Sequence, residues 1–354
     1  MKSKLLIVSL HPNGGCFHYS NEIIERITEA KEVYLNEKLD EQHNIKEYST
    51  LKDYGFNPYV RCASLLLFCL KIFIYGKFTK RYKALLLMGY TNWDNVISRT
   101  FSWTGNPIFY VVHDGKVHLG ETGTSAQKRI LGTIKHSNYL IFLSEYVKNL
   151  VKEHFGIQKK YHIAAHGLID YGNVPMSTKS KREKPILLFV GRLSEYKGIN
   201  ILLEGLENIP DVFEKVIIAG KSVQNYKVNS NNNKVEIIDK WLTENEIVHL
   251  LNECDILLLP YVEATQSGIA TLAINYLLPS IISDVGGLKE QFQKNGAIII
   301  SPESPEDLKK AIIKLSTNRE LYDEISNNLL QLRKSYSWDL IAKSLQYFIN
   351  DNII

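Results

Sequence analysis

The residues best suited to chemistry lie in short loops that follow apolar runs. Arg192 and Lys197 belong to the segment GRLSEYKG, which begins with Gly191 and connects an apolar run to a helical pattern. Two cations beside the start of a helix suit a diphosphate, because that group needs charge neutralisation and several hydrogen-bond donors. A pair of solvated surface cations is the alternative interpretation.

A second group of titratable side chains follows another apolar run. His113 and Asp114 come at the end of the run PIFYVVHD, and His118 follows four residues later. Such groups beyond a strand end could act in acid–base chemistry or bind the hydroxyls of a sugar. Their spacing matches no strong metal motif, so we expect no metal ion. A structural role is the alternative.

Small residues mark two further loops. Gly14 and Gly15 precede a helical pattern, where glycine lets the backbone approach a ligand and the helix N-terminus favours negative charge. Gly286 and Gly287 precede another, with Glu290 in its first turn. Glu290 could serve a nucleotide site or simply be a favourable charge at a helix start.

The segment Thr265-Gln266-Ser267-Gly268 connects an apolar run to a further helical pattern. Its hydroxyls, its amide and the free backbone N–H groups of residues 267–269 would suit an anionic ligand. A helix cap alone is the alternative, and both can hold together.

Parallel sheets must position these loops. Apolar runs without alternation recur along the chain, separated by helical patterns, as expected for strands covered on both faces and linked by crossover helices. The predicted strands are 4–10, 84–90, 107–114, 139–144, 185–192, 215–220, 234–239, 255–261 and 279–287. We therefore predict an α/β fold with two Rossmann-like, doubly wound domains facing across a cleft, with ligands at the carboxyl ends of the strands.

A polar, basic stretch divides the two halves and is typical of a linker. The predicted domains are 1–168, a linker over 169–184, a second domain over 185–335, and a C-terminal helix within 336–354. That helix could pack back toward the first domain or onto its own.

Composition excludes several classes of protein. The 354 residues carry a net charge of +4, too mild for a nucleic-acid partner without basic clustering. The four cysteines form no C-x-x-C pair or zinc spacing and are expected to be buried free thiols. The N-terminus lacks a signal-peptide cleavage site, and the apolar stretch 63–76 looks too short to span a membrane. We expect a cytoplasmic protein.

Residues 57–90 form an unusual segment, with six cations, interleaved aromatic residues and leucines, and no acidic residue. The pattern is typical of a surface that rests on anionic lipid, at the inner face of the plasma membrane. A core helix with a solvated basic face is the alternative.

Taken together, the motifs resemble the retaining, nucleotide-sugar-dependent glycosyltransferases of family 4, which have two Rossmann-like domains (the GT-B fold). The resemblance covers nearly the whole chain, and VGRLSEYKG at 190–198 is its most specific part. The other motifs are Gly14-Gly15 with Tyr19, His113-Asp114, LSEYV at 143–147, DILLLPY at 255–261, SDVGGLKE at 283–290 and YSWDLIA at 336–342.

The resemblance implies that the second domain binds a nucleoside diphosphate-sugar and the first binds a glycan acceptor. Arg192 and Lys197 match the pair that holds the donor diphosphate and stabilises the leaving group. His113 matches a histidine near the transferred sugar, and Gly14 and Gly15 match a loop approaching the donor phosphates. No cofactor or divalent metal is implied.

The candidate residues then fall into three groups. The catalytic candidates are His113, Asp114, Arg192 and Lys197, and the donor-binding candidates are Gly14, Gly15, Gly191, Thr265, Gln266, Ser267, Gly268 and Glu290. The acceptor-side candidates are His18, His118 and His166, of which His166 could instead satisfy the backbone near the linker.

One loop departs from the family pattern. Most members have Glu-Gly-Phe-Gly where this chain has Thr265-Gln266-Ser267-Gly268, and a second acidic position falls on or near Ala273. The ATQSG version resembles a subset of family 4 often associated with bacterial surface polysaccharides, such as O-antigen or capsule. The donor sugar and the ribose contact are therefore open.

The sequence predicts a retaining hexosyl- or related glycosyltransferase that acts on a growing glycan, with a polyprenyl-diphosphate-linked acceptor. A non-catalytic sugar-nucleotide or glycan binding protein that keeps the fold is the alternative. A nicotinamide-dependent oxidoreductase is a third class, against which the absent G-x-G-x-x-G argues.

Overall fold

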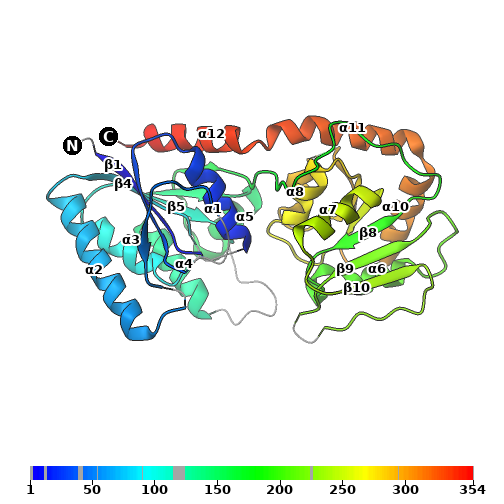
Figure 1. Cartoon of the computed structure of the whole chain (residues 1–354), viewed down its shortest axis with the longest axis horizontal. Helices are drawn as coiled ribbons and strands as arrows, with labels where there is room; N and C mark the ends of the chain where they lie inside the picture. The colour runs from blue at the N-terminus through cyan, green and yellow to red at the C-terminus, as the bar shows by residue number, and fades with distance from the viewer. Residues whose placement is uncertain are drawn as a thin grey trace. The chain divides into compact units, whose positions relative to one another are not determined.

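The computed structural model describes residues 3–11, 14–38, 43–53, 55–89, 91–114, 124–223, 226–293 and 295–353, without the side chains of 124–126. Its backbone contacts divide the chain into two compact units (Figure 1). The first unit comprises residues 1–167 and 338–354, and the second comprises residues 168–337.

The first unit is built on a seven-stranded parallel sheet in the order β3-β2-β1-β4-β5-β6-β7. Its strands are β1 (Lys4–Ser9), β2 (Lys31–Asn36), β3 (Ser49–Leu51), β4 (Tyr82–Leu87), β5 (Ile108–Val112), β6 (Tyr139–Phe142) and β7 (Tyr161–Ile163). Its helices are α1 (Gly14–Arg26), α2 (Pro58–Lys77), α3 (Asp94–Ser102), α4 (Thr124–His136), α5 (Glu145–Phe155) and α12 (Trp338–Asn350).

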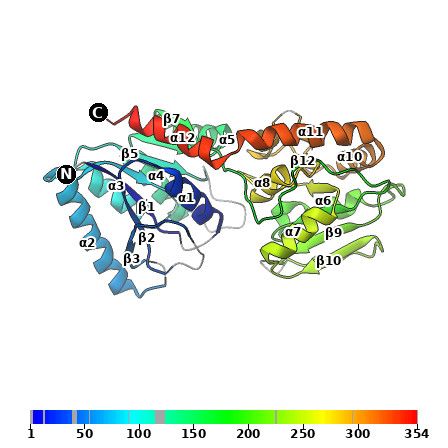
Figure 2. The same ribbon diagram turned by 45° about the horizontal axis from the view of Figure 1, so that its top comes forward.

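Alternation along β1 explains how this sheet is covered on both faces. Leu5 and Ile7 pack in a cluster with residues of α1 and α12, whereas Leu6 and Val8 pack in a second cluster with residues of α2 to α5. Within this unit, Figure 2 shows α12 at the top and α2 at the lower left. The carboxyl ends of the strands are left for loops that can carry a site.

The second unit has a six-stranded parallel sheet in the order β10-β9-β8-β11-β12-β13. Its strands are β8 (Leu187–Val190), β9 (Val216–Gly220), β10 (Val235–Asp239), β11 (Ile256–Leu259), β12 (Ser280–Ser283) and β13 (Ala297–Ile300). Its helices are the 3₁₀ turn η1 (Glu195–Lys197), α6 (Ile199–Gly205), α7 (Glu244–Glu253), α8 (Gly268–Asn275), α9 (Leu288–Phe292), α10 (Pro305–Thr317) and α11 (Arg319–Ser335).

The predicted fold class is confirmed, and a strand overlaps each of the nine predicted runs, although β4 begins two residues before the run 84–90. The sequence interpretation missed β2, β3, β7 and β13. β2 begins with the charged pair Lys31-Glu32, and β3 and β7 have only three residues each, so their apolar signal is weak. These four strands lie toward the outside of the two sheets, where burial on both faces is least demanded.

The C-terminal helix α12 belongs to the first unit. The Arg26 guanidinium of α1 donates to the Asp339 carboxylate at 2.9 Å, and the Thr28 backbone N–H donates to the Gln346 side chain at 2.8 Å. The Trp338 side chain is buried beside α1. The chain therefore leaves the first unit for 170 residues and returns to complete it.

Two expectations about α2 and the thiols need correction. The helix extends beyond the apolar stretch to twenty residues, and by length and composition it could cross a membrane, so the expectation that it is too short is wrong. Phe68 and Ile72 nevertheless pack into the core of the first unit. Of the four free cysteines, Cys69 and Cys254 are buried as expected, Cys16 is half-buried and Cys62 is exposed.

Candidate functional site

The loop after β8 brings the two predicted cations into one short turn. Arg192 directly follows Gly191, and Lys197 ends η1. The Arg192 guanidinium donates to the Tyr196 hydroxyl at 3.0 Å. The Lys197 ammonium lies 3.7 Å from the centre of the Tyr261 ring, which is a cation–π contact. Both cations are thus positioned at the carboxyl end of a central strand.

Glycine geometry fixes this turn. Gly198 has φ +70°, and a Cβ there would lie 1.8 Å from the Pro260 carbonyl oxygen at the end of β11. Gly191 has φ +137°, and its own carbonyl lies 1.8 Å from where a Cβ of Gly220 would stand. Packing therefore demands glycine at Gly198 and Gly220, whereas Gly191 is favoured by its positive φ alone.

The electrostatics of the turn suit an anion. Burial, together with the nearby Arg192 charge, lowers the pKa of Lys197 from its ordinary value to about 7. A bound diphosphate would supply an opposite charge, which would favour the charged form of Lys197. We therefore expect the neutral form of Lys197 to bind a proton when an anion binds at this turn.

The loop Thr265-Gln266-Ser267-Gly268, called the TQSG loop below, is held by the buried side-chain amide of Gln291. Ser267 donates its backbone N–H to the Gln291 side-chain oxygen at 2.8 Å, and the Gln291 amide donates to the Ser267 carbonyl at 3.1 Å. The Ser267 hydroxyl accepts from the Ala270 N–H, capping α8, and lies 3.3 Å from the Tyr261 hydroxyl. The expectation that the Ser267 N–H is free for a ligand is therefore wrong, because Gln291 occupies it.

The remaining members of this loop differ in exposure. Thr265 is buried, Gln266 is half-buried and Gly268 is exposed at the start of α8. Glu290, in α9, is also exposed, and its backbone carbonyl accepts from the Tyr336 hydroxyl. Ala273, at the second acidic position of the family pattern, is fully buried in α8.

The loop after β5 in the first unit contains the predicted histidine. His113 is buried, and its Nε2 lies 2.8 Å from the Met88 carbonyl oxygen. Because a carbonyl can only accept, Nε2 carries the hydrogen and Nδ1 is the ring's remaining polar position. The Tyr19 ring meets His113 edge-on, 5.3 Å between centroids, and the Tyr19 hydroxyl donates to the Ala164 carbonyl. Asp114 is half-buried beside it.

Opposing effects set the ionisation of this histidine. Burial acts to lower the pKa of His113, but its interactions with the Cys16 thiol, the Met88 carbonyl and Asp114 outweigh burial and raise the pKa to about 9. Burial and the neighbouring His113 charge lower the pKa of His11 to about 4, although its bond to the Gly89 carbonyl opposes this. The two rings, 6.3 Å apart, therefore carry different charges near neutral pH.

The acceptor-side candidates His18 and His166 stack on each other with ring centroids 5.9 Å apart. The His166 Nδ1 bonds to the Gly167 carbonyl at 2.7 Å, and its ring packs against Trp338. Burial lowers the pKa of His166 to about 4, so the ring is neutral. The structure thus places His166 in the packing between α1 and α12. His118 lies outside the described residues.

The predicted glycine pair begins α1. Gly14 has φ +78°, and a Cβ at Gly14 or Gly15 would meet nothing within 4 Å. The backbone here is exposed with open space around it, unlike the crowded glycines of the second unit.

Sequence reasoning missed three residues. Gln291 and Tyr261 hold the TQSG loop and Lys197, and Asp94 is a buried carboxyl at the start of α3. Burial raises the pKa of Asp94 to about 6 despite its hydrogen bonds from Thr91. Only Tyr261 had a signal, since it ends an apolar run. Across the described ranges, no group of three or more His, Cys, Asp or Glu side chains could hold a metal ion.

Part of the chain is similar in sequence to known glycosyltransferases. Residues 173–331 match the model of the family described as glycosyl transferases group 1. Two uncharacterized glycosyltransferases of Methanocaldococcus jannaschii, MJ1178 and MJ1069, are 25% and 27% identical to the chain, over 58% and 59% of its length. TuaC of Bacillus subtilis, which is assigned to teichuronic acid biosynthesis, is 24% identical over 42% of it. The matches span 57%, 57% and 37% of these relatives' own lengths.

Solved structures resemble the whole chain. Anabaena Alr3699/HepE, in complex with UDP and glucose, superposes with a TM-score of 0.75 at 14% identity, covering 99% of this chain and 100% of that one. The lipopolysaccharide outer core galactosyltransferase WaaB gives 0.71 at 14% identity, covering 99% of each chain. The fold is therefore that of the GT-B glycosyltransferases. Within it, residues 173–331, most of the second unit, carry the sequence pattern of glycosyl transferases group 1.

Proposed function

We propose that this protein is a retaining glycosyltransferase that transfers a sugar from a nucleoside diphosphate-sugar to a hydroxyl of a glycan acceptor. The observation that carries the proposal is the pairing of Arg192 with a half-buried Lys197 on a glycine-fixed turn, within the part of the chain that matches the family. The relative Alr3699/HepE, of the same fold, was solved with UDP and with UDP-glucose.

The donor diphosphate would bind at this turn. Arg192 offers a planar fork of donors and Lys197 a point charge. The N–H groups at Gly268 and Ile269 begin α8 and add the positive end of a helix. Charge develops on the leaving diphosphate during transfer, so these groups stabilise the transition state more than the bound donor. We infer that no metal ion or other cofactor takes part.

Transfer with retention would proceed on one face of the sugar. The bond from the anomeric carbon to the diphosphate oxygen breaks, and the acceptor oxygen bonds to the anomeric carbon from the same side. The acceptor proton passes to an oxygen of the leaving diphosphate, so no protein carboxylate is needed as nucleophile. His113 would lie near the transferred sugar, and its ring is oriented by the Met88 carbonyl.

The acceptor is a growing glycan on a polyprenyl-diphosphate carrier, in the assembly of a bacterial surface polysaccharide. The assignment of TuaC to teichuronic acid biosynthesis and the lipopolysaccharide role in the name of WaaB support this choice. Such an acceptor requires a cytoplasmic enzyme at the inner face of the plasma membrane, with contact through residues 57–90.

A non-catalytic sugar-nucleotide or glycan binding protein is the second candidate. It is favoured by one observation, that the second acidic position of the family pattern falls on or near the buried Ala273 of α8.

Release of nucleoside diphosphate across a panel of nucleotide sugars separates the two candidates. We expect turnover with at least one donor, and a loss of about 10²-fold or more in Arg192→Ala, as for removal of one group that stabilises developing charge. Arg319→Ala is the matched control, since Arg319 is an exposed arginine of α11. Binding of a donor without turnover would establish the binding protein, and turnover that survives Arg192→Ala would refute the diphosphate site.

A further inference from the structure

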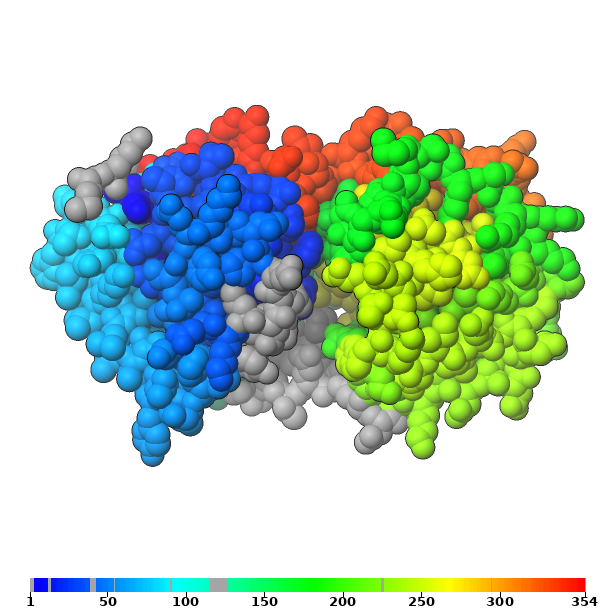
Figure 3. Space-filling model, in the orientation of Figure 1, coloured from blue at the N-terminus to red at the C-terminus, as the bar shows by residue number. Residues whose placement is uncertain are grey.

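The exposed face of α2 is apolar along its whole length. Tyr59, Leu66, Leu67, Leu70 and Ile74 recur at helical spacing and are exposed, with Leu66 at 71% and Leu67 at 67%. The opposite face, with Phe68 and Ile72, packs in the core of the first unit. The light-blue to cyan part of the chain that includes α2 forms surface at the left of Figure 3. A contiguous apolar surface of this kind marks an interaction site.

The cations of residues 57–90 are distributed differently from the expected basic face. Four of them are held by carboxylates within the unit: Arg61 by Asp53, Lys71 and Arg81 by Glu32, and Lys83 by Glu29. Lys77 and Lys80 are exposed and have no ion pair within the described part of the chain. The two lysines without a carboxylate partner therefore stand together at the C-terminal end of the apolar face.

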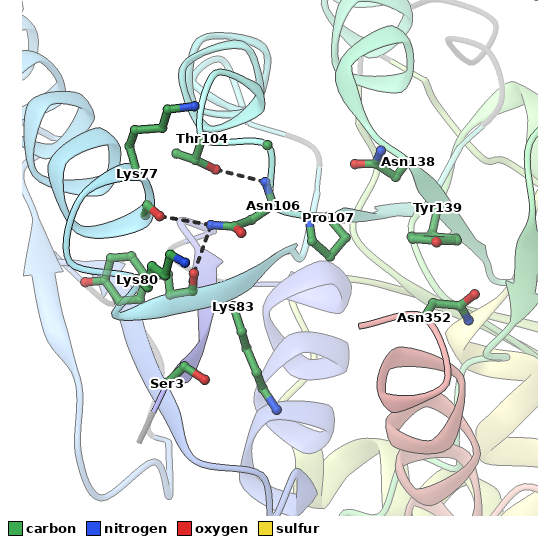
Figure 4. Close-up of a pocket in the computed structure, with 13 residues that line it drawn as sticks. Ser3, Lys77, Lys80, Lys83, Thr104, Asn106, Pro107, Asn138, Tyr139 and Asn352 are labelled. Atoms are coloured by element: carbon green, nitrogen blue, oxygen red, sulfur yellow. Dashed lines mark hydrogen bonds between the residues drawn. The ribbon is translucent and has the colours of Figure 1, made fainter. Parts of the chain in front are cut away.

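A pocket opens at that same end. It has a volume of about 660 Å³ and is lined by Lys77, Lys80 and Lys83 on one side and by Asn138, Tyr139 and Asn352 on the other (Figure 4). The Asn106 amide holds the floor by donating to the Gly76 and Tyr82 carbonyls. The pocket lies at the amino ends of β4, β5 and β6, the sheet edge opposite to the loops after β1 and β5. It is separate from the proposed transfer site.

The backbone at Lys80 suggests that its side chain is needed. Lys80 has φ +51° after the end of α2, and the Arg81 N–H bonds back to the Tyr75 carbonyl, as at a helix end closed by a left-handed residue. Glycine is strongly favoured at this position, and a residue with a side chain pays a conformational cost. Lys80 therefore places a charge beside the pocket, although a glycine at this position would make the folded protein more stable.

Aromatic side chains border the two lysines. Phe78 and Trp103 are both exposed, at 71% and 59%, and each makes an edge-on contact with the Phe73 ring. Exposed aromatic rings beside lysines are typical of the boundary between lipid headgroups and acyl chains.

We propose that α2 lies in the plane of an anionic membrane, with its apolar face among the acyl chains and a lipid phosphate bound in the pocket by Lys77 and Lys80. This deepens the proposed function, because it assigns the contact with the membrane that a lipid-linked acceptor requires. Charge complementarity selects the occupant: the lysines of the pocket match a headgroup phosphate, and the uncharged face above them matches a lipid interior. A helix packed on one side cannot span the bilayer without leaving its core.

Sedimentation of the full chain with vesicles tests the proposal. Vesicles of phosphatidylglycerol and phosphatidylcholine should bind the protein at low salt, and vesicles of phosphatidylcholine alone should bind it at least tenfold more weakly. The double variant Leu66→Gln/Leu70→Gln should lose most binding. Leu340→Gln is the matched control, since Leu340 is an equally exposed leucine of α12 and should bind as the unaltered protein does.

The charge is tested by Lys77→Gln/Lys80→Gly, which should lower the preference for anionic vesicles about tenfold. Glycine suits the backbone of residue 80, so the variant should fold at least as well, and circular dichroism checks this. Lys227→Gln/Lys314→Gln, at two exposed lysines of the second unit, is the control for net charge.

Three outcomes would overturn the proposal: no vesicle binding at low salt, binding unchanged in both double variants, or a dimer in gel filtration that dissociates in Leu66→Gln/Leu70→Gln without any vesicle binding. The last would assign the face to a second copy of the chain. Release of nucleoside diphosphate in detergent, with no vesicles present, tests the proposed function separately. Each hypothesis can therefore fail while the other stands.

Discussion

The loops at the carboxyl ends of the two sheets are built in opposite ways. In the second unit, the cations are placed by glycines that no other residue could replace, as at Gly198, and by groups a few residues apart. In the first unit, His113 is placed by Met88, Tyr19 and its neighbours through buried ring packing, with partners from distant parts of the chain. The comparison teaches that the two cations are placed by one short turn packed against the end of β11, whereas His113 is placed by partners from several distant segments.

Removal of the half-buried Lys197 should have the largest effect. Lys197→Ala should lower kcat/KM by about 10²–10³-fold, because it removes a charge where negative charge develops. Isothermal titration calorimetry with the nucleoside diphosphate should show weakened binding, whereas His113→Gln should leave that affinity unchanged. If both variants weaken diphosphate binding equally, the division between the units is wrong.

Substitution of the crowded glycine should come next. Gly198→Ala should lower the free energy of unfolding by about 3 kcal/mol, because it adds a strained left-handed alanine and a contact with the Pro260 carbonyl. Gly14→Ala is the control: its φ is also positive, but its surroundings are open, so the cost should be about 1 kcal/mol. Urea denaturation followed by tryptophan fluorescence gives both values, and equal costs would contradict the difference in crowding.

Loss of the amide that holds the TQSG loop should cost less. Gln291→Ala leaves the buried N–H and carbonyl of Ser267 without their partner, which should cost about 2 kcal/mol of stability. Because Gln291 positions the loop through the backbone, KM for the donor should rise more than kcat falls. Gln331→Ala in α11 is a matched glutamine control. A purely structural role would lower stability and leave KM unchanged.

The smallest effect concerns pH. Burial holds the pKa of Lys197 near 7, below its ordinary value, so the free protein loses this charge as pH rises above 7. Donor binding favours the charged form and should take up a proton there, so the dissociation constant should rise by at most about tenfold per pH unit above 7. Calorimetry in buffers of different ionisation enthalpy detects the proton. Lys197→Arg, which stays charged, should remove the dependence, and an unchanged slope in that variant would assign it to another group.

The parts of the molecule that sequence could predict share a physical basis. Strands such as β8 and β11 are apolar on both faces because helices cover both sides, so their composition alone reveals them. The Arg192–Lys197 turn is also local, because its glycines and cations lie within eight residues.

The other features of the fold and the candidate site depend on contacts between residues far apart in the chain, which the spacing of residues in a motif does not reveal. The cations of 57–90 looked like one basic face, but Glu32 and Glu29, in and before β2, hold three of them and leave α2 with an apolar face. Likewise, the sequence predicts a free backbone N–H at Ser267, but this N–H donates to the side chain of Gln291, 24 residues away. His166 could be assigned to neither role from sequence, since Trp338 reaches it from the far end of the chain.

The return of α12 to the first unit has a consequence for the order of synthesis. Residues 168–337 form a continuous unit that can fold as soon as it has left the ribosome. The first unit can complete its fold only after residues 338–350 have been synthesised. Until then, Ile23 and Ile24 of α1 lack the apolar cover of α12. The unit whose residues are made first is therefore the last to be completed, and nascent chains that stop before Trp338 should be the ones that chaperones retain.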